Sequence, residues 1–340
     1  MSIIMEVVRV AYGLPVERIT FLTTGWVSFC YKAETPTGQS YMVKLYDESM
    51  PEPLLATSRD FYLPLTYQLF TQGLLTQIPC PVRALDGRFW VRAGHFVMIV
   101  LHFIDGELVG FGESGLDALS GEFLAKLAGL VGRLHNSTGA LGLVSPLTED
   151  FRIAFEDVLP AGLEALAAPG PAGRTGWQGF QQLLLPRRTE ILGHLARLKT
   201  LQSILKARST EMVICHTDLH GGNLLVDSER NLCILDWEGA MLAPPEQDLF
   251  FFAAEDRFWE FFWPHYLREF PGARLDVDTL GFYYYRRGLE DLTEWLQRLC
   301  CANQDEEQVR NALHWAAETV AGLSAVETTL DKIAAHLQRH

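Results

Sequence analysis

The chain lacks two features that would point to a membrane or a nucleic acid as its partner. It has no uninterrupted run of about 18 apolar residues, the length that a membrane-spanning helix requires. It also has only 28 Lys and Arg residues against 42 Asp and Glu residues, a formal net charge of −14. Nucleic-acid-binding proteins usually carry excess basic charge, so we expect neither partner. The acidic balance suits a cationic ligand, although it also serves solubility.

Cysteine is scarce, and its spacing does not suit cross-links or metal binding. The six cysteines include no Cys-x-x-Cys pair, and the only adjacent ones are Cys300 and Cys301. A secreted disulfide framework or a zinc site needs more regular spacing. The N-terminal stretch is interrupted by Glu6 and Arg9 and has no small-residue cleavage site, unlike a signal peptide. We therefore expect a cytoplasmic protein with reduced thiols.

The first hundred residues are dominated by strand patterns. Residues 3–11 repeat at helical spacing, whereas residues 18–46 alternate as three strands. Residues 56–72 have a helical pattern that Pro64 should kink or break. Residues 80–103 indicate further strands, the last of them a nearly continuous apolar run that is typical of a buried strand.

After Gly106 the pattern becomes mainly helical. A helix is expected over residues 116–137, and residues 160–176 are rich in Ala, Gly and Pro, which predicts a flexible excursion. At 340 residues the chain is long enough for two lobes. We therefore predict an α+β fold with a small β-rich lobe, residues 1–103, and a larger helical lobe, residues 104–340.

A short β-like island, residues 211–238, lies between the helices and carries the chemistry. Asp218 and Asn223 flank a Gly-Gly loop, and a predicted hairpin then returns Asp236 beside Asn223. One amide oxygen and one carboxylate suit Mg²⁺, a hard ion that prefers oxygen ligands. The other carboxylate, Asp218, remains to accept a proton from an attacking hydroxyl.

The motif HTDLHGGN, followed by the hairpin and ILDWEG, resembles the aminoglycoside phosphotransferase-like branch of the protein-kinase-like superfamily. That branch has Asp-Trp-Asp/Glu where protein kinases have Asp-Phe-Gly. The runs DWEGAMLAPPEQDL and YYYRRGLEDL are most similar to the spectinomycin phosphotransferases of the branch. The resemblance implies a bilobal, protein-kinase-like fold with a small antiparallel-sheet N-lobe and a helical C-lobe.

Site residues follow from the resemblance one position at a time. Asp218 resembles the catalytic aspartate, and Asn223 and Asp236 resemble the Mg²⁺ ligands, while Glu238 could serve a second metal. The flanking histidines, His216 and His220, are expected to order the loop.

On the nucleotide side, Lys44 in YMVKLY resembles the strand lysine that meets the α- and β-phosphates. Its expected acidic partner on the next helix is Asp60. The remaining candidates form the phosphate-covering loop and the hinge beside the base, namely Thr24, Gly25 and Ser28 in the loop and Leu101, His102 and Ile104 in the hinge.

The resemblance implies transfer of the γ-phosphate of ATP or GTP to a hydroxyl of a small, cationic acceptor, with a role in antibiotic resistance as one possibility. Acidic residues of the helical lobe are candidates to bind that acceptor: Glu255, Asp256, Glu290, Asp291 and Glu294. The alternatives are a kinase of choline, homoserine, thiamine or a methylthio-sugar, and a nucleotide-binding pseudokinase. A monomer and a homodimer both remain open.

Overall fold

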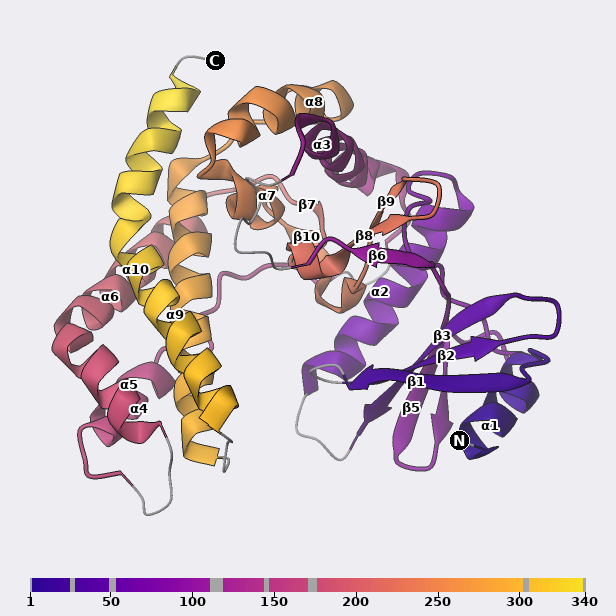
Figure 1. The fold of residues 1–340 in the computed structure, drawn as a ribbon. Coiled ribbons are helices and arrows are strands. Elements are labelled where there is room, and N and C mark those ends of the chain that lie inside the picture. The colour runs from indigo at the N-terminus through magenta and orange to yellow at the C-terminus, as the bar shows by residue number, and fades with distance from the viewer. Residues whose placement is uncertain are drawn as a thin grey trace. The chain divides into compact units, whose positions relative to one another are not determined.

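The computed structural model describes residues 2–24, 28–48, 53–110, 119–143, 147–170, 176–301 and 306–338 (Figure 1). The chain forms two compact units. Unit 1 consists of Met1–Thr148, Val213–Leu242 and Glu260–Pro271, and unit 2 of Glu149–Met212, Ala243–Trp259 and Gly272–His340.

Unit 1 begins with a helix and an antiparallel sheet. The sheet has the order β1-β2-β3-β5-β4, and its strands are β1 (Arg18–Thr24), β2 (Phe29–Glu34), β3 (Ser40–Asp47), β4 (Trp90–Ala93) and β5 (Phe96–His102). Gly38 closes the β2–β3 turn at φ +83°, a left-handed backbone conformation that favours glycine. The three strands predicted over residues 18–46 are confirmed.

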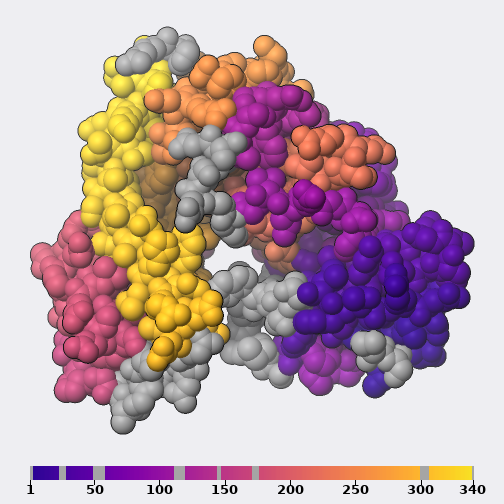
Figure 2. Space-filling view, in the orientation of Figure 1, coloured from indigo at the N-terminus to yellow at the C-terminus, as the bar shows by residue number. Residues whose placement is uncertain are grey.

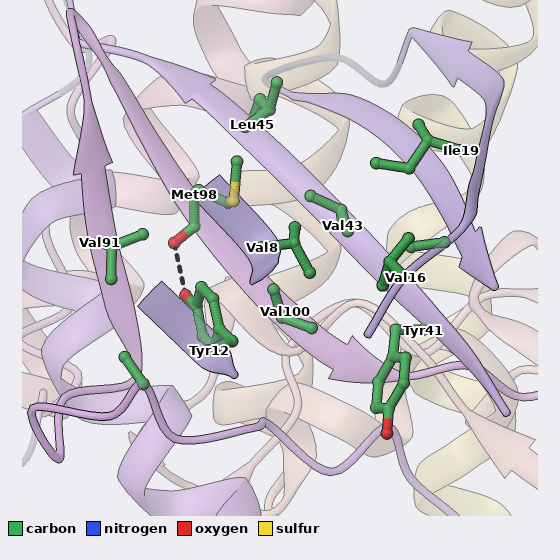
Figure 3. Packing of buried hydrophobic residues seen from close by; sticks show 12 residues of the cluster. Val8, Tyr12, Val16, Ile19, Tyr41, Val43, Leu45, Val91, Met98 and Val100 are labelled. Atoms are coloured by element: carbon green, nitrogen blue, oxygen red, sulfur yellow. Dashed lines mark hydrogen bonds between the residues drawn. The ribbon is translucent and has the colours of Figure 1, made fainter. Parts of the chain in front are cut away.

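One face of this sheet is buried under helix α1 (Ser2–Tyr12). Val43 and Val100 are fully buried there, and the hydroxyl of Tyr12 donates to the carbonyl of Met98 at 2.9 Å (Figure 3). Because side chains alternate along a strand, this packing turns Lys44 of β3 to the opposite face. The helix ends as predicted, with Gly13 at φ +68°.

Two local expectations in this unit need correction. Helix α2 (Pro53–Thr71) is not broken at Pro64, and the alternative that the sequence allowed, a kink, stays a prediction. Residues 80–85 form no strand and make only an isolated bridge, Pro81 with Leu101. Two backbone bonds flank this bridge, from the N–H of Val82 to the carbonyl of Val100 and from the N–H of His102 to the carbonyl of Cys80, both at 2.8 Å.

The rest of unit 1 surrounds the predicted hairpin. Ser120 caps the N-terminus of helix α3 (Gly121–Asn136), because its hydroxyl accepts the N–H of Phe123 at 3.1 Å. Helix α3 packs against α8 (Trp263–Glu269). Strands β6 (Gly106–Leu108), β8 (Leu224–Asp227) and β9 (Leu232–Ile234) form a three-stranded sheet in the order β6-β8-β9. Strands β7 (Val213–Cys215) and β10 (Met241–Ala243) form a two-stranded sheet.

Unit 2 is helical. Its helices are α4 (Val158–Leu166), α5 (Trp177–Leu184), α6 (Arg188–Lys206), α7 (Glu246–Ala253), α9 (Val277–Cys301) and α10 (Glu306–Leu337). Helix α9 packs against α10, α6 and α4. The flexible excursion predicted over residues 160–176 is wrong in its first part, because α4 buries Leu159 and Leu163 completely.

The chain also forms short 3-10 turns, among them η2 (Ser137–Ala140) and η3 (Leu185–Arg187), and a π-helical turn, η6 (Phe258–Phe262). Among the described helices, none is both long and apolar enough to cross a membrane. The predicted α+β class is confirmed, with a small antiparallel sheet and a larger helical part. The lobe boundary after residue 103 stays a prediction, since unit 1 also takes in β6, α3 and the hairpin.

Candidate active site

The β8–β9 hairpin sets the frame of the site. The carboxylate of Asp227 accepts the backbone N–H groups of Glu229 at 2.9 Å and Asn231 at 2.7 Å, which closes the turn. This turn is exposed and lies at the surface beside α3 (Figure 2). At the other end of the hairpin, the N–H of Leu235 donates to the carbonyl of Asn223 at 2.8 Å. The chain therefore returns beside Asn223, as the sequence predicted.

His216 ties the loop before the hairpin to the end of β9. Its Nδ1 accepts the backbone N–H of Asp218 at 3.3 Å, so its proton lies on Nε2, which donates to the carbonyl of Leu235 at 2.7 Å. The ring is fully buried, with Trp237 packed edge-on against it. These bonds match the ordering role expected of this histidine.

Asp218 and Asn223 are joined inside the loop. One carboxylate oxygen of Asp218, Oδ2, accepts Nδ2 of Asn223 at 3.0 Å and Nε2 of His220 at 3.1 Å. His220 accepts the N–H of Gly222 on Nδ1, at 3.1 Å, which places its own proton on Nε2. Two donors therefore hold the carboxylate in one orientation, while 38% of the Asp218 side chain stays exposed.

Two glycines allow the chain segments of the loop to approach closely. A Cβ on Gly221 would lie 2.3 Å from the carbonyl oxygen of Gly110, and one on Gly239 would lie 2.4 Å from Oγ1 of Thr217. The N–H of Gly110 also donates to the carbonyl of Gly221 at 3.0 Å. The contact at Gly221 is with backbone, so no side chain fits there without moving the loop.

Asp236 follows β9 in a left-handed backbone conformation, at φ 64°. A non-glycine residue in this region stores strain, on the order of 1 kcal/mol, and such strain concentrates at functional sites. Its Oδ1 lies 2.5 Å from Nζ of Lys44. Burial alone would raise the pKa of Asp236, but Lys44 beside it lowers that pKa to about 2. Asp236 is thus held ionised.

Lys44 is shared by two carboxylates. Its Nζ also donates to Oε1 of Glu238 at 2.6 Å, and the hydroxyl of Tyr46 donates to the same oxygen at 2.5 Å. Burial opposes the charge of Lys44, yet the two carboxylates raise its pKa well above the ordinary value. Burial raises the pKa of Glu238 although Lys44 opposes the shift. The lysine is therefore cationic.

The predicted metal pair fits a hard ion. Nδ2 of Asn223 is used by Asp218, and within the described chain Oδ1 accepts no hydrogen bond, as a ligand oxygen requires. Together with the ionised Asp236 it offers one amide oxygen and one carboxylate. Glu238, predicted as a further ligand, turns Oε1 to Lys44 and Tyr46, and its role as a metal ligand stays a prediction. Oε1 of Glu238 already accepts two donors.

Asp60 does not meet Lys44. Its Oδ1 accepts Nε1 of Trp90 at 2.9 Å, and its side chain is 64% exposed. The guanidinium of Arg59 lies over the Trp90 ring, 4.0 Å from its centre, so these two α2 residues fasten the helix to β4. The ion pair expected between Lys44 and Asp60 is therefore wrong, and Glu238 occupies that position.

The phosphate-covering loop is only partly described. Thr24 is the last residue of β1, but its side chain and the whole of Gly25 lie outside the described residues. Ser28 is buried, with Oγ 3.6 Å from Sγ of Cys30. Its hydroxyl therefore lies within the fold, and its contact with phosphate stays a prediction.

At the hinge, part of the backbone is already bonded. The N–H of His102 donates to Cys80 at 2.8 Å, and that of Phe103 donates to Ser40 at 3.1 Å. The N–H of Ile104 has no acceptor in the described part of the chain. If a base binds here, Ile104 is the available donor, whereas His102 can offer only its carbonyl. Leu101, the residue predicted behind the pocket, is buried.

Sequence reasoning missed Tyr46 and Tyr62. Tyr46 lies two residues after Lys44, and the alternation along β3 places both side chains on one face. The position of Tyr46 could therefore have been predicted from the sequence. Tyr62 of α2 is only 4% exposed, and both Glu238 and Lys44 influence its hydroxyl. No local pattern marks that residue, because its neighbours come from the distant hairpin.

A small antiparallel sheet with a buried, carboxylate-paired lysine, joined to a hairpin that carries Asp218, Asn223 and Asp236, defines a phosphotransferase of the protein-kinase-like fold. The sequence profile of the phosphotransferase enzyme family matches residues 18–286, and the chain belongs to that family. It is therefore an enzyme, and the predicted class, a phosphotransferase acting on hydroxyl groups, is confirmed.

Individual proteins agree with this assignment. The chain is 26% identical to protein StrN of Streptomyces griseus over 255 residues, which cover 70% of this chain and 71% of StrN. The fold is similar to that of spectinomycin phosphotransferase APH(9)-Ia bound to ADP and spectinomycin, with a TM-score of 0.72, 19% identity and coverage of 95% and 97% of the two chains. It is also similar to amicoumacin kinase hAmiN, with a TM-score of 0.65, 15% identity and coverage of 96% and 93%.

Proposed function

We propose that this protein transfers the γ-phosphate of ATP or GTP to a hydroxyl of a small cationic molecule, such as an aminocyclitol or an aminoglycoside. The observation that carries the proposal is one cluster in unit 1. There Lys44 lies 2.5 Å from Asp236, and the adjoining loop binds Asp218 to Asn223 at 3.0 Å. A strand lysine, a loop aspartate and a hairpin Asn/Asp pair are the parts that phosphoryl transfer to an alcohol requires.

In the reaction the acceptor oxygen forms a bond to the γ-phosphorus, and the bond from that phosphorus to the β,γ-bridging oxygen breaks. The hydroxyl proton passes to Asp218, and the nucleoside diphosphate leaves. Asp218 is suited to this step because His220 and Asn223 fix one of its oxygens. Most of the rate gain would come from positioning and electrostatics.

Lys44 would hold the α- and β-phosphates, and its raised pKa keeps it cationic near neutral pH. Asn223 Oδ1 and Asp236 would hold Mg²⁺, which supplies positive charge beside the phosphates when it is bound. The pKa of Asp236 is about 2, so this ligand is already ionised at working pH and needs no deprotonation.

The cationic acceptor is the finer part of the proposal. The net charge of −14 favours a cation, and two proteins of similar fold bind spectinomycin and amicoumacin. Three of the predicted acceptor-binding acids already pair with basic side chains: Asp256 with His336, Asp291 with Arg287 and Glu294 with Arg298. Glu290 of α9 stays a candidate: burial raises its pKa, and Arg286 and Arg287 on the same helix oppose that rise.

The test is turnover of Mg-ATP and Mg-GTP with a panel of acceptors: spectinomycin, aminoglycosides, choline, homoserine, thiamine and a methylthio-sugar. Asp218→Ala is the inactive control. Asp157→Ala is the matched control, because Asp157 is exposed and makes no side-chain cap bond. Acceleration by an aminocyclitol or aminoglycoside that disappears only in Asp218→Ala supports the proposal.

Two other outcomes would change the conclusion. Acceleration by choline, homoserine, thiamine or the sugar alone would keep the mechanism and replace the acceptor class. Nucleotide binding with no acceleration across the panel would contradict the acceptor assignment and favour a nucleotide-binding pseudokinase.

A further inference from the structure

Two donors from strand β3 converge on one oxygen of Glu238. Lys44 and Tyr46 alternate on the same face of β3, and both reach Oε1, at 2.6 Å and 2.5 Å. A carboxylate oxygen held by an ammonium and a hydroxyl has little rotational freedom. The same two bonds also fix where the Lys44 amine points.

Lys44, Glu238 and Tyr46 are shielded from solvent, whereas the side chain of Asp236 is 52% exposed. The exposed fractions of the Lys44 and Glu238 side chains are 12% and 16%, and Tyr46 is 6% exposed. Tyr62 of α2 adds a second buried hydroxyl beside that of Tyr46. Helix α2 packs here against η5 (Trp237–Gly239), the turn that carries Glu238. Bonds in such a dry site are stronger and more directional than at the surface.

The described residues of α2 supply no carboxylate to Lys44. Asp60 is bonded to Trp90 on the sheet instead. Asp236 does contact Lys44, but it is also the predicted metal ligand, and a metal would compete for it. A buried lysine without a carboxylate is strongly destabilising, so a second acid would be needed if a metal took Asp236. Glu238 is placed to be that acid.

We propose that Glu238 is a positioning residue for Lys44, that Tyr46 holds Glu238 in place, and that Glu238 does not act as a metal ligand. The inference rests on the proposed function only in assigning Lys44 to the nucleotide phosphates. Glu238 acts through the lysine, so any effect of changing it must depend on the lysine being present.

The test is a double-mutant cycle read by calorimetric binding of ADP, once with EDTA and once with Mg²⁺. With EDTA, we expect Glu238→Gln to weaken ADP binding about 10-fold when Lys44 is present. In the Lys44→Met background the same change should alter affinity by less than about 2-fold. Glu238→Asp, which keeps the charge, should recover part of the affinity. Equal losses in both backgrounds would overturn the proposal, as would a loss seen only with Mg²⁺.

Tyr46 has a matched control on the same strand. Tyr41 lies on the opposite, core-facing side, and its hydroxyl contacts Gln39 at 3.3 Å. We expect Tyr46→Phe to weaken ADP binding several-fold and Tyr41→Phe to leave it unchanged. If both variants had lower urea midpoints but unchanged affinity for ADP, Tyr46 would have only a structural role. That result would overturn the proposal that Tyr46 holds Glu238 in place.

Neither measurement uses an acceptor. A failed acceptor screen would therefore contradict the proposed acceptor class, whereas the double-mutant cycle could still support the role of Glu238. Failure of the wild-type protein to bind ADP at all would overturn both proposals together.

Discussion

Glu246 gives unit 2 a pH dependence of stability that can be calculated from the structure. This residue lies in the first turn of α7, is 3% exposed, and accepts the backbone N–H of Asp276 at 2.7 Å. Burial raises its pKa from 4.5 to about 7, the negative charge of Asp276 adds to the rise, and Arg208 opposes it. Between these two pH values the folded chain holds a proton that the unfolded chain has already lost.

The sign follows from proton binding. Stability falls with rising pH wherever the native state binds more protons than the unfolded state. The gap of about 2.5 pH units, 7 minus 4.5, corresponds to about 3 kcal/mol at 1.36 kcal/mol per unit. The contribution of Glu246 should therefore be most favourable below pH 4.5, fall as the pH rises toward 7, and be constant above that.

The perturbation is Glu246→Gln, which keeps an oxygen acceptor for Asp276 and removes the ionisation. We expect the variant to gain about 2.5 kcal/mol over the wild type at pH 8, relative to their difference at pH 5. The assay is urea unfolding followed by tryptophan fluorescence at half-unit steps over that range. Glu164→Gln, at an exposed position of α4, is the control and should give a flat difference. A flat difference for Glu246→Gln would refute the reasoning.

Three further predictions concern the candidate site. Asp218→Asn should lower turnover by about 10²–10⁴-fold in a steady-state assay without lowering the urea midpoint. Chelation with EDTA should abolish turnover, Mg²⁺ should restore it, and Asn223→Ala should raise the Mg²⁺ concentration needed for half-maximal rate. Gly221→Ala should reduce turnover sharply, because its Cβ would lie 2.3 Å from the Gly110 carbonyl, whereas Gly193→Ala, with nothing within 4 Å, should leave turnover unchanged.

The parts of the site that are close in sequence were predictable. Residues 215–238 contain the loop, the turn and the returning strand, so a single hairpin prediction placed Asn223 beside the segment that ends in Asp236. The alternation in β3 likewise placed Lys44 on the face opposite the α1 core. In both cases short-range periodicity determines the geometry.

The partners of Lys44 were not predictable, because they depend on contacts about 190 residues apart in sequence. Asp60 lies on α2, as the sequence predicted, but its carboxylate accepts a hydrogen bond from the indole of Trp90. No sequence pattern predicts that bond. Helix α4 was misread for a related reason. Its Ala, Gly and Pro content suggests a linker, while the burial of Leu159 and Leu163, which stabilises the helix, is a tertiary effect.

Lys44 pairs with Glu238 and not with Asp60, and this difference changes which element holds the lysine in position. In protein kinases the strand lysine pairs with a glutamate on the neighbouring helix, so the position of that helix decides whether the pair forms. Here Glu238 lies two residues after Asp236, on the same short turn. Placing that turn correctly therefore delivers both the metal-side carboxylate and the acid that orients Lys44. A shift of α2 would act on the Lys44–Glu238 bond indirectly, through Tyr62 and through the packing of α2 against that turn.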